Sequence, residues 1–479
     1  MRLIIFAFLA LVAGGSCSFV NPYPRFERYR DGGDPGEPLY LTPLIRAGKI
    51  TEAQQKATVT GGQFNWVQSY SGYLTVNDKY KSNLFFWYFP PKSNSYEPVV
   101  LWLQGGPGAS SLFGLFTENG PFSVSPEGKL VQREFAWNRN HHLIYIDNPV
   151  GTGFSFTQDD VGYARNEKDV GRDLFEAIQQ IFTLFPHMQQ LDFWITGESY
   201  AGKYVPALAY KIHLNKLRAQ RRKKSVNVPI KLKGIAIGNG LSDPFHQLKY
   251  GDYLYQIGLI DIHGRDIFHA HEKAGRKCIS DHKMDCAFKE FDILINMDES
   301  PQGSVFRNLT GYNTYFNFLK TEEAPDEAAM GKFLQTSEVR KAIHVGNNSF
   351  HDLKGENKVE KLLMNDVMDS VAPWIAELLS VYRVCIYNGQ LDIIVAYPLT
   401  INYLQRLKFR DANIYKTARR NIWRVDNEIA GYAKEAGNLI EVLVRDAGHM
   451  APADQPKWVF NMITRLTHGK GKSFIDAKV

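Results

Sequence analysis

Short, continuous apolar runs alternate with longer amphipathic stretches over most of this sequence. Each run is too short for a buried helix and is followed by Gly, Asn or Asp, which favours a strand. The stretches between the runs, such as residues 166–185, have apolar residues at helical spacing. Strands buried on both faces and joined by helices predict an α/β fold with a mostly parallel central sheet and helices on both faces. The runs are VVLWLQ (99–104), LIYIDNP (143–149), FWITGE (193–198), IAIGNG (235–240), VCIYNG (384–389) and EVLVRD (441–446).

Two regions depart from this alternation. Two β-rich runs, SGYLTV at 71–76 and NLFFWYF at 83–89, are separated by polar residues and predict an antiparallel hairpin at an edge of the sheet. Between residues 240 and 384 the alternation stops, which indicates a cap inserted into the core that shapes the entrance to a site. The mature chain is therefore divided into a first core part (61–245), an inserted cap region (246–375) and a second core part (376–479).

The first eighteen residues have the order of a secretory signal peptide. A basic Arg2 is followed by an apolar run from Leu3 to Val12 and by small residues up to Ser18, and the run is too short to span a bilayer. Residues 19–60 are rich in Pro, Gly and charge, so we expect an extended leader or propeptide-like segment that lies on the body or is removed. The protein is expected in the secretory pathway, either secreted or in a lysosome-like acidic compartment.

Charge and composition exclude several classes of protein. The chain of 479 residues is 44% hydrophobic with a net charge of only +6, which is typical of a folded protein with a large core. One dense basic run, 215–224, contains no aromatic residue, so nucleic acid is not an expected partner. The run indicates a solvated helix end or a processing-protease site. No later stretch approaches the roughly 20 apolar residues of a membrane helix, and the sequence leaves the oligomeric state open.

The cap region holds both candidate disulfide cysteines and both sequons. The spacing of Cys278 and Cys286 suits a short disulfide loop. Cys385 lies in an apolar run, where a buried inert thiol is expected rather than a nucleophile. Asn308 and Asn347 begin Asn-x-Ser/Thr sequons and are candidate glycosylation sites.

The stretch WITGESYAGKY (194–204) places Ser199 where an apolar strand gives way to a helical segment. It fits the Gly-x-Ser-x-Gly nucleophile elbow of the α/β-hydrolase fold, with Ala201 in the last place. A serine needs a histidine to take its proton and a carboxylate to orient that histidine. In this fold both follow the serine, acid first, each just beyond a strand, and Asp392 and His449 have that order and placement.

An oxyanion also needs hydrogen-bond donors. The glycine-rich turn at 105–108 follows an earlier strand, and we expect the backbone N–H groups of Gly106 and Tyr200 to form the oxyanion hole. A simple tight turn is the alternative for this stretch. There is no His-Glu-x-x-His and no paired Cys-x-x-Cys, so neither a metal nor another cofactor is expected.

Together, LWLQGGPGASS, GESYAGKYVPA, NGQLDIIV and GHMAPADQP resemble the serine carboxypeptidases (peptidase family S10), in that family's order, over about residues 65–465. The leader and the Gln-Gly-Gly-Pro form most resemble the vitellogenic-like subgroup. The resemblance implies that Glu118 and Glu198 share a proton and bind the substrate's C-terminal carboxylate, helped by Gly105 and by Gln104, which stands where the family usually has Asn. It also suggests that Met450 lines the leaving-residue pocket, with plain packing as the alternative.

These observations predict a serine-type carboxypeptidase that acts at acidic pH on peptides or proteins with a free C-terminus, through an acyl-enzyme at Ser199. An acyltransferase or esterase on the same scaffold is the first alternative, and retention of both Glu118 and Glu198 argues against it. An inactive secreted storage or binding homologue is the second, and the intact triad argues against that.

Overall fold

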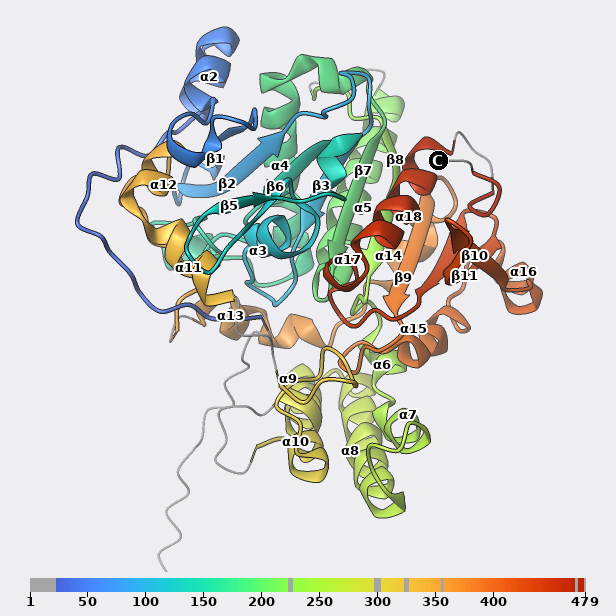
Figure 1. Ribbon diagram of the computed structural model, residues 1–479. Helices are drawn as coiled ribbons and strands as arrows, with labels where there is room; N and C mark the ends of the chain where they lie inside the picture. The colour runs from blue at the N-terminus through green and yellow to red at the C-terminus, as the bar shows by residue number, and fades with distance from the viewer. Residues whose placement is uncertain are drawn as a thin grey trace, which may run out of the picture.

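A computed structural model describes residues 23–222, 227–296, 303–322, 327–354, 357–469 and 473–477. These residues form a ten-stranded sheet in the order β1-β2-β6-β3-β7-β8-β9-β12-β11-β10, and a small two-stranded sheet, β4-β5 (Figure 1). The strands are β1 (Tyr70–Asn77), β2 (Ser82–Phe89), β3 (Val99–Leu103), β4 (Phe122–Val124), β5 (Leu130–Gln132), β6 (His142–Ile146), β7 (Phe193–Glu198), β8 (Leu232–Gly238), β9 (Arg383–Gly389), β10 (Asn421–Val425), β11 (Glu428–Ala436) and β12 (Leu439–Val444).

The helices precede, connect and follow these strands. They are α1 (Thr42–Arg46), α2 (Ile50–Ala57), α3 (Ser111–Phe113), α4 (Glu167–Leu184), α5 (Ala201–Arg222), α6 (Pro244–Gln247), α7 (Tyr250–Gln256), α8 (Ile262–Ser280), α9 (Met284–Phe291), α10 (Val305–Thr310), α11 (Glu327–Gln335), α12 (Ser337–Ala342), α13 (Lys358–Val367), α14 (Ala372–Leu378), α15 (Tyr397–Leu404), α16 (Ala412–Thr417), α17 (Ala451–Asp454) and α18 (Pro456–His468). A π-helix, Gly114–Asn119, continues α3.

The six apolar runs form the parallel centre of the sheet. Strands β6, β3, β7, β8, β9 and β12 pair in parallel, while the edge strands pair antiparallel. The hairpin prediction is confirmed, because β1 pairs with β2 in an antiparallel register and β1 lies at the edge. Since parallel strands end at the same edge of the sheet, residues that follow β3, β7, β9 and β12 are brought together there.

Residues of each central strand point alternately into two cores, one on each face of the sheet. In β3, Val99, Leu101 and Leu103 join the core that contains the apolar faces of α4 and α5. Val100 and Trp102 join the opposite core, together with α18. This double burial explains why the strand is apolar at every position rather than at every second one.

Helix α4 illustrates how the sequence sets the ends of these elements. Asn166, the N-cap residue, accepts hydrogen bonds through its side-chain oxygen from the backbone N–H groups of Lys168 and Asp169, in the first turn where N–H groups lack the usual helical partner four residues back. The apolar residues that follow at helical spacing are buried against the sheet and α5.

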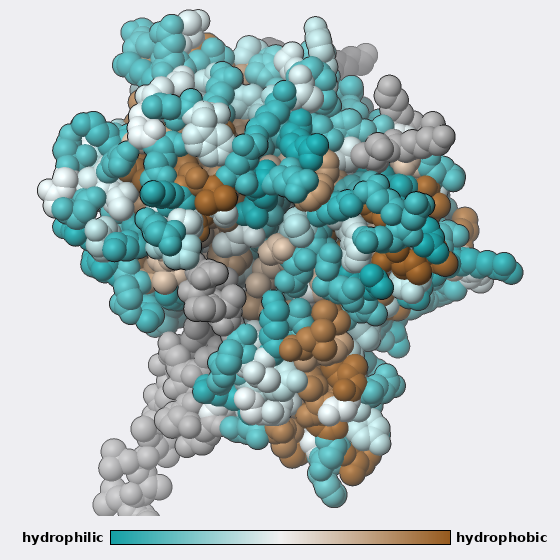
Figure 2. Space-filling view, viewed as in Figure 1, coloured by the Kyte–Doolittle hydropathy of each residue, from teal (hydrophilic) through white to brown (hydrophobic). Residues whose placement is uncertain are grey.

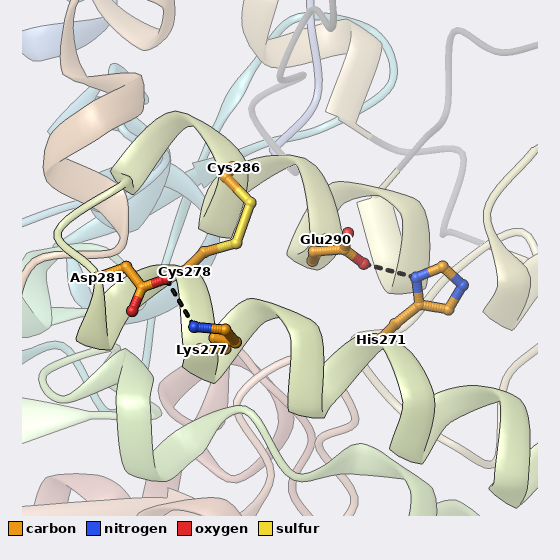
Figure 3. Close-up of a disulfide and its surroundings, with 6 residues drawn as sticks. All are labelled: His271, Lys277, Cys278, Asp281, Cys286 and Glu290. Carbon is orange, nitrogen blue, oxygen red and sulfur yellow. Dashed lines mark hydrogen bonds and ion pairs between the residues drawn. A yellow bond between two sulfur atoms is a disulfide. The ribbon is translucent and has the colours of Figure 1, made fainter.

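The long interval between β8 and β9 contains α6 to α14. Helices α7 to α10 project from the sheet as a helical extension (Figure 1). The disulfide between Cys278 and Cys286 joins α8 to α9, beside the ion pair of His271 and Glu290, whose Nδ1 and Oε2 atoms are 2.7 Å apart (Figure 3). Apolar side chains gather on the surface of this extension (Figure 2), where Ile262 and Ile267 of α8 are exposed.

The described part of the leader is not uniformly extended. Residues 42–46 and 50–57 form α1 and α2, although the sequence shows no strong period there. These short helices are held by contacts with α4 and β1 rather than by their own propensity. The signal peptide expected at 1–18, with Cys17, lies outside the described residues, as do positions 223–226 of the basic run. No helix within the described ranges has both the length and the apolar character needed to cross a bilayer.

Candidate active site

Ser199 lies at a strained turn between β7 and α5. Its φ of 63° falls in the left-handed region, which a residue with a side chain rarely occupies. Two backbone hydrogen bonds hold this conformation: Ser199 N donates to Gly238 O at 3.0 Å, and Leu241 N donates to Ser199 O at 3.0 Å. The turn therefore directs the hydroxyl away from the strand end, at the edge where the parallel strands terminate.

Glycines let neighbouring segments approach this turn. A β-carbon on Gly105 would lie 2.5 Å from Tyr200 N and 2.7 Å from the β-carbon of Ser199. A β-carbon on Gly202 would lie 2.7 Å from Leu241 N. The glycine-rich turn after β3 is thus packed directly against the serine, and Gly106, with a φ of 110°, continues it.

His449 and Asp392 form a fully buried hydrogen-bonded pair. The Nδ1 atom of His449 lies 2.9 Å from Asp392 Oδ2. Phe316 stacks on the imidazole, with ring centroids 5.0 Å apart and planes inclined by 13°, and its carbonyl accepts the His449 backbone N–H at 2.7 Å. The Nε2 atom of His449 has no hydrogen-bond partner among the described residues, so it can accept a proton from a hydroxyl group.

Next to Ser199 lies a buried pair of carboxyl groups. Glu198 ends β7, whereas Glu118 belongs to the π-helix that follows α3. The amide of Gln104 bridges the two, because its Nε2 lies 3.1 Å from Glu118 Oε1 and 3.1 Å from Glu198 Oε1. Trp102 Nε1 donates to Gln104 Oε1 at 2.8 Å, which fixes the orientation of the amide so that its NH₂ group faces both acids.

Burial of the two carboxyl groups favours their neutral forms. It raises the pKa of Glu118 to about 7. Burial, and then the charge of Glu118, raise the pKa of Glu198 well above its usual range. A hydrogen bond joins the two groups, so they titrate as a unit and hold at least one proton in mild acid.

Tyr23, from the leader, also reaches this pair. Its hydroxyl donates to Glu198 Oε1 at 2.8 Å, and its side chain is buried. Tyr23 and Glu198 are 175 positions apart, and the leader sequence contains no motif that would indicate this contact. Sequence reasoning therefore missed this residue, and it could be found only from the folded chain.

Behind Tyr200 lies a second buried polar cluster, which sequence reasoning also missed. The Tyr200 hydroxyl donates to Asp366 Oδ2 at 2.7 Å, and Lys203 Nζ forms an ion pair with the same oxygen at 3.3 Å. Asp366 belongs to α13, in the interval between β8 and β9, whereas Tyr200 and Lys203 belong to the elbow and α5. Burial and the adjacent Asp366 raise the pKa of Glu167. The cluster ties α13 to the turn that carries Ser199.

The sequence of this chain is similar to those of known proteins. A sequence profile described as serine carboxypeptidase matches residues 61–469. The chain belongs to the serine carboxypeptidase family. It is 53% identical to the venom serine carboxypeptidase of Apis mellifera, over 98% of this chain and 99% of that protein. It is 51% identical to the vitellogenic carboxypeptidase of Aedes aegypti, over 94% of each chain, and 47% identical to the probable serine carboxypeptidase CPVL of Homo sapiens, over 92% of this chain and 91% of that protein.

The family and enzyme class predicted from the motifs are confirmed: the chain is a serine-type carboxypeptidase, a hydrolase of the exopeptidase class. Kex1(Δ)p, a prohormone-processing carboxypeptidase from Saccharomyces cerevisiae, has a similar structure, with a TM-score of 0.67 over 87% of this chain and 96% of that chain. At 23% identity this likeness speaks for the fold alone, and it confirms the predicted α/β-hydrolase fold.

The remaining residues singled out in the sequence differ in their burial. Met450 directly follows His449 and is partly buried against both cores. Cys385 is a buried free thiol whose pKa burial raises to about 12, which leaves it protonated and inert. Asn308 and Asn347, the sequon residues, are exposed.

Asn239 is a further site residue that sequence reasoning missed. Its Nδ2 donates to Asp392 Oδ2 at 2.7 Å, the same oxygen that contacts His449, and its Oδ1 accepts the Gly389 N–H at 3.1 Å. A φ of 43° aims the side chain from the end of β8 across to the loop after β9. The run IAIGNG offered one signal, a polar residue directly after a central strand.

Replacing Asn239 by Ala should lower kcat about 10- to 100-fold with KM nearly unchanged. The carboxylate of Asp392 would keep its histidine and the N–H of Val395 at 3.3 Å, but it would lose the shorter hydrogen bond from Asn239 that helps to orient it and offsets its burial. Steady-state kinetics on a blocked dipeptide measures both constants. Asn83→Ala is the matched control, since that buried amide donates to Lys81 O, away from Asp392. Equal loss in the two variants would mean that Asn239 serves only stability.

Proposed function

We propose that the enzyme removes C-terminal amino acids through an acyl-enzyme at Ser199. His449 Nε2 takes the hydroxyl proton as Ser199 Oγ attacks the last peptide carbonyl, and Asp392 holds the resulting imidazolium. The tetrahedral intermediate expels the terminal amino acid, whose amine receives the proton from His449. A water molecule, deprotonated by His449, then cleaves the Ser199 ester and releases the shortened peptide.

In this proposal, the N–H groups of Gly106 and Tyr200 stabilise the oxyanion. The proposal is supported by the close packing of the glycine-rich turn against the elbow, where a β-carbon on Gly105 would lie 2.5 Å from Tyr200 N. The hydrogen bond from the Tyr200 hydroxyl to Asp366 holds the second donor from behind. Met450 then borders the place of the leaving residue, because it directly follows His449.

The observation that carries exopeptidase specificity is the buried pair Glu118 and Glu198 beside the serine. A protonated carboxyl group can donate a hydrogen bond to the substrate's terminal carboxylate, whereas an ionised pair repels it. Gln104 and the backbone at Gly105 complete this recognition. Because burial raises the pKa of Glu118 to about 7, binding should be strongest in mild acid and weaken as the pH rises past that value.

The test is hydrolysis of one N-blocked dipeptide with either a free or an amidated C-terminus, from pH 4 to 8. The free acid should be preferred by about 100-fold in kcat/KM at pH 5, because the amide cannot accept from the acid pair in the same way. Equal cleavage of both forms would move the function to an esterase or acyltransferase. No turnover of either form, and no labelling of Ser199 by a serine reagent, would point to a storage or binding role.

We further propose a secretory destination, outside the cell or in an acidic compartment. The relatives include proteins named for venom and for vitellogenesis. The disulfide between Cys278 and Cys286, and the exposed sequon residues Asn308 and Asn347, suit an oxidising compartment that adds glycans. An acidic location would also keep the Glu118 and Glu198 pair protonated.

A further inference from the structure

The ring of Tyr23 lies where a substrate would have to bind. Its centroid is 5.1 Å from that of Phe113, 5.9 Å from that of Phe316 and 6.2 Å from that of His449. The hydroxyl donates to Glu198 Oε1, the acid assigned above to the substrate's terminal carboxylate. One side chain therefore contacts both the histidine and the carboxylate-binding acid.

The groups of the site are closed off with Tyr23 in place. Ser199 is only 5% exposed, and Glu198 and His449 are fully buried. Glu198 Oε1 already accepts from both Tyr23 and Gln104. A peptide that presents its terminal carboxylate to Glu198 must therefore displace the phenol first.

The residues directly after Tyr23 are held in place by contacts with residues 352–354 and with Glu360. Arg25 forms an ion pair with Glu360 and lies 3.9 Å from Asp352. Phe26 N donates to Asp352 O at 2.9 Å, and Lys354 N donates to Phe26 O at 3.1 Å, so the segment adds a short β-bridge to residues 352–354. These are specific backbone and charge contacts, of the kind by which a bound peptide is held.

Asp352, which holds this segment, also contacts residues beside the glycine-rich turn. Asp352 accepts the Ser110 N–H at 2.7 Å and the Gly153 N–H at 3.3 Å, and Ser110 follows the glycine-rich turn at 105–108. Beyond these contacts the chain is accessible, since Glu27, Arg28 and residues 30–34 are exposed. The segment thus has a buried end in the site and an exposed stretch that a protease can reach.

We propose that residues 23–34 act as an intramolecular inhibitor, with Tyr23 occupying the place of the substrate's C-terminal residue on Glu198. The enzyme is latent while Tyr23 is seated and becomes active when the segment withdraws or is cut in its exposed stretch. The inhibition competes with substrate, so it raises KM more than it lowers kcat. This inference rests on the proposed function, because it takes Glu198 as part of the substrate site.

The test compares Tyr23→Phe and Tyr23→Ala with the matched control Tyr29→Phe. Tyr29 belongs to the same segment, but its ring faces Lys332 at 4.9 Å. Two readouts are used: the rate at which a small fluorophosphonate labels Ser199, and kcat/KM for an N-blocked dipeptide with a free carboxylate. Loss of the buried hydrogen bond should raise both in Tyr23→Phe by about tenfold, with a larger rise in Tyr23→Ala and none in Tyr29→Phe.

A second measurement does not depend on the stability of these variants. A recognition sequence for a site-specific protease is inserted between Gly32 and Gly33, which are both exposed. Cutting the folded full-length protein should raise both rates, and an added peptide spanning residues 23–32 should lower them again. The uncut insertion protein and the protease-treated wild type are the controls.

The two readouts separate this proposal from the proposed function. Faster labelling without peptide hydrolysis in any form would support the inhibitor and overturn the carboxypeptidase assignment of the site. Hydrolysis that falls in Tyr23→Phe, or that stays unchanged after cutting, would overturn the inhibitor and make Tyr23 a permanent wall of the substrate site.

Discussion

Replacing Ser199 by Ala should reduce peptide hydrolysis by about 10⁵- to 10⁶-fold, which is the largest effect expected of any single substitution in this chain. The reason is chemical, because without the hydroxyl no acyl-enzyme can form, and the histidine and oxyanion donors have no bound nucleophile to act on. His449→Ala should cost about as much, and the double variant little more, since the two residues act as one unit.

Hydrolysis of the blocked dipeptide under single-turnover conditions measures this loss, and mass spectrometry of the quenched reaction detects the acyl-enzyme on the peptide that contains Ser199. The matched control is Ser242→Ala, because that nearby buried serine donates its hydroxyl to Gly202 O at 2.9 Å. Thermal unfolding should show that both variants fold. A Ser199→Ala variant that keeps more than about a hundredth of the wild-type rate would exclude Ser199 as the nucleophile.

The parallel centre of the fold could be predicted because the information is local. Each central strand is buried on both faces, so every position is apolar, and the pattern can be recognised without knowledge of the neighbouring strand. The nucleophile elbow is equally local, since Gly197, Ser199 and Gly202 stand in one short stretch. Asp392 and His449 could then be predicted, because in this fold the acid and the histidine follow the serine in that order.

The residues that sequence reasoning missed depend on contacts between distant segments. Asn239 lies 153 positions from Asp392, and only the pairing of β8 with β9 brings them together. Tyr23 belongs to a leader with no periodic pattern, and its position is fixed by the anchoring of Arg25 and Phe26. Helices α1 and α2 were missed for a related reason, because packing rather than propensity stabilises them.

The pair of Glu118 and Glu198 could be predicted only in part from the sequence. A glutamate beside a nucleophile is visible in the sequence, but its protonation state depends on burial, which the sequence does not give directly. Glu118 and Glu198 are 80 positions apart, and the folded chain joins them through the amide of Gln104. The family resemblance supplied their partnership, whereas the structure supplies its physical cause, the cost of burying two charges in one site.

The second large effect is expected at this pair. Wild-type kcat/KM for a free-acid dipeptide should fall above about pH 7, close to tenfold per unit, as Glu118 loses its proton and a negative charge faces the substrate's carboxylate. In Glu118→Gln, the carboxyl group of Glu198 loses the neighbouring charge and hydrogen bond that raise its pKa, although burial remains. The fall should therefore begin at a lower pH, which narrows the acidic range of activity.

Glu198→Gln should instead raise KM for the free acid about 10- to 100-fold at pH 5, with a much smaller effect on the amidated dipeptide, because only the free acid uses the carboxyl donor. Full pH profiles of kcat and KM for both substrates measure these changes, with the exposed Glu428→Gln as the control for loss of a charge. A profile whose midpoint stays in place in Glu118→Gln would assign the pH dependence to a group outside this pair. If the midpoint moves down as expected, one buried carboxyl pair both selects the free C-terminus and confines the enzyme to acidic surroundings.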